Sequence, residues 1–366
     1  MVSTLGSIKT STLLSLLVLA GVLFASGCGL RRNAIDTPLI SDSEQPDKDL
    51  FDRAADFLEH NKFTEARLLL QTLINTYPDS EYLAKSKLAI ADSWYRQGTS
   101  TDLAQAEAEY RDFITFFPTM PEAGEAQMRV AMIHYRGMEK ADRDPTHARR
   151  AEQEFQRLLM NYPDGPFVPV AEQRLREVQE VLALGNFEIG RFYFLNLADR
   201  AAQPRLTELV ERYPNFSKAD TALYYLGRSI DRQSGQEKEE EASRYYSRIV
   251  RDYPLSEYAE DAKKQLQALG SPVPQPDPAA VARMTYERTH TDEPGMVDRF
   301  WDIFHRRPNV AAAQGKTSPP TLTPQGPAQP GLISSNTDDG EANLNGGTGA
   351  GTSSGISMEQ VPTPAP

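Results

Sequence analysis

An aromatic residue followed by proline recurs five times along the middle of the chain, and this repeat restricts the fold more than any other feature. The pairs are Tyr77-Pro78, Phe117-Pro118, Tyr162-Pro163, Tyr213-Pro214 and Tyr253-Pro254. Alanine stands twelve residues before each of these prolines, and bulky apolar residues stand eight, five and four residues before it. These spacings put the apolar side chains on one face of an α-helix, which proline ends because it lacks a backbone donor. The chain therefore holds five copies of a helix with a fixed stop.

Each of these helices has a partner helix before it. In the first and fourth copies a small residue, Ala54 or Gly190, stands twelve residues before the alanine, and an aromatic, Phe57 or Tyr193, stands nine before it. This pattern is typical of the tetratricopeptide repeat (TPR). The other copies have longer inter-helix connections and use Ala91, Ala131 and Gly227. We therefore predict an all-α, right-handed solenoid of five TPR-like helical hairpins rather than an irregular helical bundle.

The predicted solenoid covers residues 47–269. Its five units are expected at about 47–80, 81–120, 121–164, 185–216 and 217–255. The stretch 167–184 lacks a small residue in register, so we expect an extra helix there or a lengthened one. An amphipathic stretch at 256–269 is expected to cap the stack. The remaining residues, 270–366, are rich in proline and glycine and are expected to be mostly disordered.

One segment of this tail differs in composition from the rest of it. In 296–307, four apolar residues follow the i, i+3, i+4, i+7 spacing of a helix face: Val297, Phe300, Trp301 and Phe304. We predict a short amphipathic helix that docks on a partner or on the membrane interface. The alternative is that it folds back onto the solenoid as an extra cap.

The amino terminus has the pattern of an export signal. Lys9 precedes an apolar run from Leu13 to Phe24, which is shorter than the roughly 20 residues that span a bilayer. Small residues then lead to Cys28, the only cysteine. This resembles the bacterial lipobox, so we expect 1–27 to be removed and Cys28 to be lipidated. An ordinary export signal with an incidental cysteine is the alternative. Residues 28–46 are expected to be a tether, and Gly29 in place of aspartate favours the outer membrane.

Composition argues against most chemistry. The chain has 39 Lys and Arg against 51 Asp and Glu, a formal charge of −12, which disfavours nucleic-acid binding. A single cysteine rules out an intramolecular disulfide and a cysteine-built zinc site, and the five histidines are scattered. No nucleophile, metalloprotease or phosphate-loop motif occurs. We predict no catalytic residue, no metal and no cofactor other than the covalent lipid.

The first helices of the hairpins are expected to line a concave groove. Tyr95-Arg96 of the second unit is repeated as Tyr135-Arg136 in the third, and aromatic and arginine side chains dominate many interfaces. We predict that an extended peptide binds there, with arginine facing a carboxylate or backbone carbonyls. Alternatively, the tyrosines are half-buried packing residues and the arginines pair with neighbouring acids. The candidate residues are Lys85, Asp92, Tyr95, Arg96, Tyr135, Arg136 and Arg232.

A loop before the second helix of the third unit carries the most specific motif. It reads Asp142-Arg143-Asp144-Pro145, with Ala148 three residues further on. A lipobox, five TPR-like hairpins and this loop together resemble the BamD family, lipoproteins of the β-barrel assembly machinery. The resemblance covers 47–269, and the long tail departs from it.

The resemblance implies a non-enzymatic scaffold on the periplasmic face of the outer membrane. The implied partners are the POTRA domains of a BamA-like barrel subunit, bound by the C-terminal units, and unfolded outer membrane proteins, bound by the N-terminal units. Other lipoproteins of the assembly complex are implied as well. The competing hypotheses are a different periplasmic TPR adaptor, serving cell-wall synthesis or pilus and secretin assembly, and an envelope-tethered chaperone or enzyme cofactor.

Overall fold

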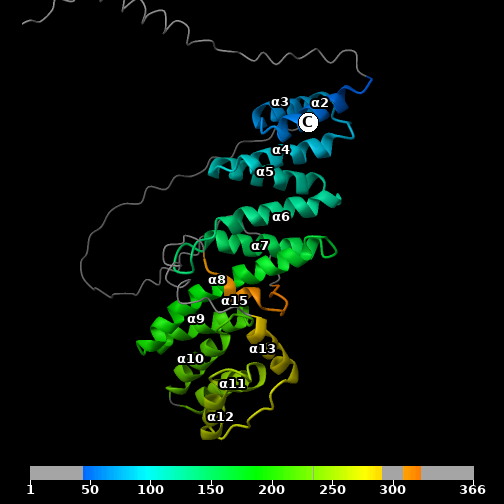
Figure 1. Ribbon diagram of the computed structural model, residues 1–366. Coiled ribbons are helices and arrows are strands. Elements are labelled where there is room, and N and C mark those ends of the chain that lie inside the picture. Colours follow the sequence, from blue (N-terminus) through cyan, green and yellow to red (C-terminus); the bar gives the residue numbers. More distant parts are fainter. Residues whose placement is uncertain (1–43, 234, 291–307, 323–366) are drawn as a thin grey trace, which may run out of the picture. The chain divides into compact units, whose positions relative to one another are not determined.

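The computed structural model describes residues 44–233, 235–290 and 308–322, and their regular secondary structure is helical (Figure 1). None of the described helices is long and apolar enough to span a membrane. The expected signal 1–27, Cys28, nearly all of the tether and the tail helix 296–307 lie outside the described residues. The helices of the predicted solenoid are α2 (Pro46–Glu59), α3 (Phe63–Thr76), α4 (Leu83–Gln97), α5 (Ser100–Phe116), α6 (Pro121–Arg136), α7 (Thr146–Asn161), α8 (Val168–Leu195), α9 (Asp199–Arg212), α10 (Ala219–Asp231), α11 (Gln236–Asp252) and α12 (Ala259–Ala268).

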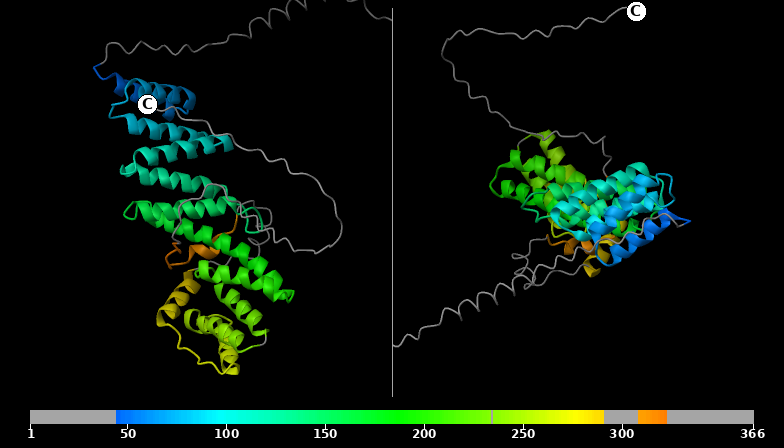
Figure 2. Two further views of the ribbon diagram at one scale, coloured as in Figure 1. Left: turned by 180° about the vertical axis from the view of Figure 1, so that it is seen from behind. Right: turned by 90° about the horizontal axis from the view of Figure 1, so that it is seen from above.

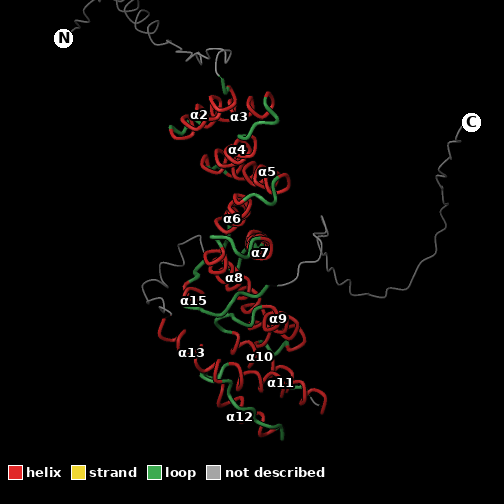
Figure 3. Tube along the Cα trace, turned by 90° about the vertical axis from the view of Figure 1, so that its right-hand side faces the viewer, coloured by secondary structure: helices red, strands yellow, loops and turns green. Residues whose placement is uncertain are grey.

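These helices form five hairpins in chain order, and each helix packs against the next. Figure 3 shows α2, α4 and α6 on one side of the stack and α3, α5 and α7 on the other. The last helix, α12, packs on α11. The predicted all-α solenoid of TPR-like hairpins with a capping helix is confirmed.

The repeated apolar positions form the core. The alanine twelve residues before each proline is fully buried in every hairpin, and so are Tyr110, Phe155 and Tyr246 at the bulky position. The two helices of a hairpin approach closely where the small residue was predicted. A Cβ on Gly190 would stand 2.7 Å from Leu206 Cδ2, so only glycine fits there without a shift.

Each second helix ends as predicted. The aromatic residue before the proline is the C-cap, and its N–H donates to the carbonyl four residues earlier, as Tyr77 does to Leu73 at 2.8 Å. Phe117, Tyr162, Tyr213 and Tyr253 do the same. Proline follows and cannot extend the ladder.

Helix α8 differs from the expected boundaries. The stretch 167–184 and the first helix of the fourth unit form one helix of 28 residues, Val168–Leu195. The proline of this helix, Pro169, stands in its first turn, where proline is tolerated. It therefore does not separate the two parts. The lengthened helix, rather than the separate one, is therefore what the structure contains, and it contacts α6, α7, α9 and α10.

The tail also departs from expectation in two stretches. Helix α13 (Pro278–His290) is held to α11 by a bond from Asp277 N–H to Arg251 O at 3.0 Å and one from Arg283 to Asp252 O at 2.6 Å. Residues 308–322, with α15 (Ala311–Gln314), lie against α8 (Figure 2). Both stretches make backbone contacts with the solenoid, so the expectation of disorder does not hold for them.

Candidate functional site

Part of the predicted groove comes together between α4 and α6. Tyr95 is almost buried, and the guanidinium groups of Arg129 and Arg136 lie 5.2 and 4.9 Å from its ring centroid. Asp92 accepts a hydrogen bond from the Tyr110 hydroxyl, and burial raises the pKa of the Asp92 carboxyl. Lys85 and Asp92 line a small cavity of about 130 Å³.

The other groove candidates are engaged within the chain. Arg96 donates to Asn61 Oδ1 at 3.2 Å, and Arg232 pairs with Asp199 at 3.0 Å. The Tyr135 hydroxyl donates to Glu177 Oε2 at 2.5 Å, and burial, aided by this contact, raises the pKa of Tyr135 to about 12. The contacts of Tyr135 and Arg232 match the alternative in which the tyrosines pack and the arginines pair with acids, whereas Arg96 bonds an amide oxygen. The peptide groove remains a prediction, with Tyr95 as its centre.

The motif loop borders a larger cavity. Asp142, Arg143, Pro145 and Ala148 line a cavity of about 680 Å³ together with residues of α8 and α9. The loop lies directly on α8, because a Cβ on Gly185 would stand 2.8 Å from Ala141 O.

Within the motif, Asp144 lies two residues before the start of α7. Its Oδ1 accepts hydrogen bonds from the N–H and the hydroxyl of Thr146, at 2.9 and 2.6 Å. These bonds, the hydroxyl first, lower the pKa of the Asp144 carboxyl. Ala148, one turn further along, is buried in the apolar core. The motif therefore holds the loop in place beside the cavity rather than supplying reactive groups to it.

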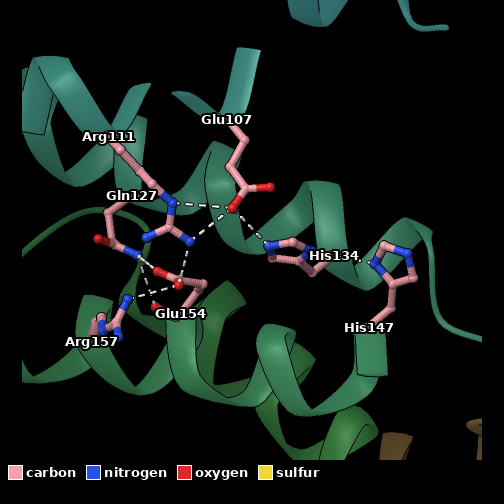
Figure 4. Close-up of polar contacts among 7 residues, drawn as sticks. All are labelled: Glu107, Arg111, Gln127, His134, His147, Glu154 and Arg157. Atoms are coloured by element: carbon pink, nitrogen blue, oxygen red, sulfur yellow. Dashed lines mark hydrogen bonds and ion pairs between the residues drawn. The ribbon is translucent and has the colours of Figure 1, made fainter. Parts of the chain in front are cut away.

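A polar network supports the loop from the side of α5 and α6 (Figure 4). Its centre is Glu154 of α7, which is 3% exposed and accepts from Arg111 and Arg157 at 2.8 Å each. Gln127 of α6 donates to the second carboxylate oxygen at 2.8 Å. A buried carboxylate is costly without partners, so the contact of Glu154 with Arg111 of α5 has to be kept in the folded chain. This contact fixes the second and third hairpins relative to each other.

The network continues to two histidines. Arg111 also donates to Glu107 Oε1 at 2.9 Å, and His134 Nε2 lies 3.2 Å from the same oxygen, in ion-pair range but without hydrogen-bond geometry. The contact with His134, followed by the bonds from Arg111, outweighs burial and lowers the pKa of Glu107 to about 2. His134 Nδ1 in turn lies 3.3 Å from Nδ1 of His147, which is at the start of α7 (Figure 4).

The opposite wall of the cavity is apolar and exposed. Ile189 and Phe192 of α8 line it, and Leu195 and Leu197 follow them at the helix end. We call these four residues the α8 patch; they are 44, 62, 58 and 71% exposed. Several exposed apolar side chains close together in sequence, beside a concave surface, are typical of a protein-binding site. Sequence reasoning missed it, although the same positions in the first hairpin are polar.

The charged residues around the cavity have both signs. Arg205 and Arg212 face it from α9 together with Glu208. Arg212 is itself bound to the buried carboxylate of Glu152 at 2.8 Å. Mixed charge around an apolar wall is the composition of a protein interface, with an apolar centre and a polar rim.

Comparisons with known proteins identify the family of the chain. A sequence profile of the YfiO family, described as outer membrane lipoprotein, matches residues 43–245. The outer membrane protein assembly factor BamD of Caulobacter vibrioides is 25% identical over 271 residues, covering 74% of this chain and 87% of that protein. The BamD of Vibrio cholerae is 27% identical over 188 residues, covering 49% and 77%.

Among solved structures, the TPR2AB domain of yeast Sti1 in its pHSP90 complex aligns over 62% of this chain and 90% of that one. Its identity is 14% and its TM-score 0.30. The sequence matches confirm the resemblance to BamD proteins. The chain belongs to the YfiO family of outer membrane lipoproteins.

Proposed function

We propose that this protein is a lipid-anchored scaffold of outer membrane protein assembly, held on the periplasmic face of the outer membrane. The observation that carries the proposal is the α8 patch beside the motif-loop cavity, in a chain whose relatives are named BamD. The patch and cavity offer a protein-binding surface of apolar and charged groups. The proposed role is binding rather than catalysis, with no cofactor.

The anchor is the diacylglycerol on Cys28. One acyl chain binds a membrane only marginally, whereas several chains hold it firmly. Cys28→Ser should move the protein from the membrane fraction to the soluble periplasmic fraction. Retention of the variant on the membrane would contradict the anchor while leaving the role of the α8 patch open.

The proposed partner of the α8 patch is the POTRA region of a BamA-like barrel subunit. This assignment is supported by the position of the patch in the fourth hairpin, where the resemblance places the docking surface. Tagged protein should co-purify with a POTRA-containing barrel subunit and with other lipoproteins of the complex, and its depletion should lower outer membrane protein levels. Co-purification with cell-wall synthesis or secretin components instead would favour the adaptor alternative.

The proposed ligands of the first hairpins are unfolded outer membrane proteins. Tyr95, with two guanidinium groups over its ring and a cavity one turn away, offers an aromatic and cationic surface for a peptide carboxylate. Tyr95→Ala should weaken binding of a carboxy-terminal barrel peptide about tenfold, as one interface aromatic does. Tyr135→Ala is the matched control, because its hydroxyl is bound to Glu177. Equal affinity in Tyr95→Ala and wild type would refute the groove.

A further inference from the structure

A segment of the tail, which begins at the end of the short helix α15, crosses the amino-terminal half of α8. We call residues 313–322 the strap. Thr321 is held by one side chain of α8: Gln179 Oε1 accepts from its N–H at 3.1 Å, and Gln179 Nε2 donates to its carbonyl at 2.7 Å. Gln156 Nε2 of α7 donates to the same carbonyl at 3.2 Å. A primary amide that pairs with the N–H and the C=O of one residue recognises backbone and not a particular side chain.

The other contacts follow the same rule. Asn215 donates to Pro319 O at 2.9 Å, Gln173 to Ala313 O at 3.3 Å, and Arg176 to Ser318 O at 3.4 Å. All of these acceptors are main-chain carbonyls of the strap. The solenoid side chains that bind the strap therefore form a row of amide and guanidinium donors along α7, α8 and the turn before α10. We call this row the strap site: Gln156, Gln173, Arg176, Gln179 and Asn215.

One strap side chain is recognised as well. Lys316 is buried, with its side chain 10% exposed; its ammonium group donates to Asn215 O and lies 3.9 Å from Glu180 Oε2. Burial lowers the pKa of Lys316, and Glu180 opposes this effect. Glu180 is itself 6% exposed. The buried carboxylate of Glu180 thus borders the strap site and suits a cation five residues before Thr321, the residue held by Gln179.

The side chains of the strap site all belong to the solenoid, on α7, α8 and the turn before α10. With the strap in place, Gln156 and Gln179 are 2 and 7% exposed. Their amides then bind main-chain groups of the strap away from water, and Gln179 Nε2 also lies 3.4 Å from Glu152 Oε1. Most strap contacts are to main-chain groups, so the site does not require the strap sequence itself.

We propose that the strap site is a binding site for an extended polypeptide segment of another protein, and that the strap occupies it in cis. The partner segment is read through its main chain, with a lysine or arginine at the position of Lys316. Because the strap is covalently tethered, it competes at an effective concentration on the order of millimolar, so a partner must displace it. This inference does not rest on the proposed function, since its residues lie apart from the α8 patch and from Tyr95.

The test uses the whole chain and a fluorescent peptide with the sequence of residues 312–322. The double substitution Lys316→Ala with Thr321→Pro releases the strap, because it removes the buried cation and the N–H that Gln179 accepts, and it changes no solenoid residue. The released protein should bind the peptide at least tenfold more tightly than wild type, measured by fluorescence anisotropy. Equal binding by the two proteins would overturn the proposal.

Two further variants test the site itself. In the released protein, Gln179→Leu should weaken peptide binding at least tenfold, and Gln179→Glu, which keeps an acceptor but loses the donor, should weaken it less. Gln105→Leu, at an exposed glutamine of α5, is the matched control and should leave binding unchanged. If Gln179→Leu binds as the control does, the site is not the one described. Circular dichroism of each variant separates lost binding from lost fold.

Altered peptides test the main-chain recognition. A peptide with Thr321→Ala keeps the backbone groups and should bind within threefold of the original. A peptide with Thr321→Pro lacks the N–H and should bind at least tenfold more weakly. Equal losses for the alanine and proline peptides would mean that the side chain is read, which contradicts the proposal.

Discussion

The hairpins α2–α3 and α8–α9 correspond residue by residue around their turns, because each closes through a three-residue loop. In the first loop Asn61 has φ 58°, and in the second Leu197 has φ 60°. The residue after each donates to the carbonyl five residues earlier, Lys62 to Phe57 at 2.8 Å and Ala198 to Tyr193 at 2.9 Å. The two loops therefore share one backbone conformation, including a left-handed residue.

Their outward surfaces are opposite in character. The four residues of the α8 patch correspond to polar residues in the first hairpin; these are Arg53, Asp56, Glu59 and Asn61. Since the same backbone forms with either set, folding does not require the apolar residues of the fourth hairpin. Exposed apolar residues that folding does not need indicate a binding surface. Shared structure thus comes from the buried positions, and the difference in function comes from the outward ones.

The largest test exchanges the two surfaces. Replacing the α8 patch by the residues of the first hairpin, as Ile189→Arg, Phe192→Asp, Leu195→Glu and Leu197→Asn, should weaken capture of the barrel subunit about a thousandfold, or about 4 kcal/mol. The helical circular dichroism should be unchanged, because all four positions are exposed. Affinity is measured with purified POTRA domains by surface plasmon resonance.

The reverse exchange is the control. Asp56→Phe in the first hairpin adds an exposed aromatic at the position equivalent to Phe192, without the motif-loop cavity beside it. It should leave the affinity of the wild type unchanged. If the variant with the exchanged patch binds the POTRA domains as tightly as wild type, the α8 patch is not the surface that binds them.

A second test concerns the contact between the two helices of each hairpin. Gly190 and Ala54 are equivalent, but a Cβ at Gly190 would meet the fully buried Leu206. Gly190→Leu should lower the free energy of unfolding by about 3 kcal/mol through overpacking. Ala54→Gly should cost only about 1 kcal/mol, the helix propensity of glycine. Urea denaturation followed by circular dichroism measures both changes. A urea midpoint of Gly190→Leu equal to that of wild type would show that the fourth hairpin accommodates a larger side chain at this position.

A third test uses the left-handed loop residues. Leucine is strained at positive φ, whereas asparagine tolerates it. Leu197→Asn should therefore raise the free energy of unfolding by about 0.5 to 1 kcal/mol, and Asn61→Leu should lower it by a similar amount. Thermal denaturation of the two variants checks the pair. Shifts of the same sign would mean that the loops are not equivalent.

Sequence alone predicts the hairpins because their determinants are local and repeated. The buried alanine, the bulky residue four positions later and the aromatic cap at the helix end are all visible as columns. The sequence leaves open whether 167–184 is a separate helix or lengthens the next one, because Val168–Leu184 has no small residue in register. A missing small residue does not break a helix; it only removes the close contact with a partner.

The functional surfaces were harder to predict for different reasons. The strap leaves no pattern in the tail, because carbonyl groups that any residue carries make most of its contacts. Tyr135 was placed in the groove by its spacing, but its hydroxyl is bound to Glu177, which comes from the lengthened part of α8. The α8 patch was visible in principle, since aligning outward positions of the first and fourth hairpins shows four polar residues against four apolar ones.

The smallest effect concerns how acid acts on the two hairpins. In the first, the Ser80 hydroxyl donates to Asp47 Oδ2 at 2.6 Å and lowers the pKa of that carboxyl. The equivalent residues in the fourth hairpin are Ala183 and Phe216, whose side chains have no titratable group. Because the folded pKa is the lower one, the stabilisation is present above the unfolded value of 3.8 and is lost as pH falls through the folded value.

Acidification from about pH 5 to about pH 3 should therefore reduce amide protection at the start of α2 and leave the middle of α8 unchanged. Hydrogen exchange followed by mass spectrometry, corrected for the intrinsic rate at each pH, measures this difference. Asp47→Asn should remove the pH dependence at α2, because the amide does not titrate in this range. Equal loss of protection in both helices would mean that acid acts on the stack as a whole, and the hydrogen bond between Asp47 and Ser80 would then not distinguish the first hairpin from the fourth.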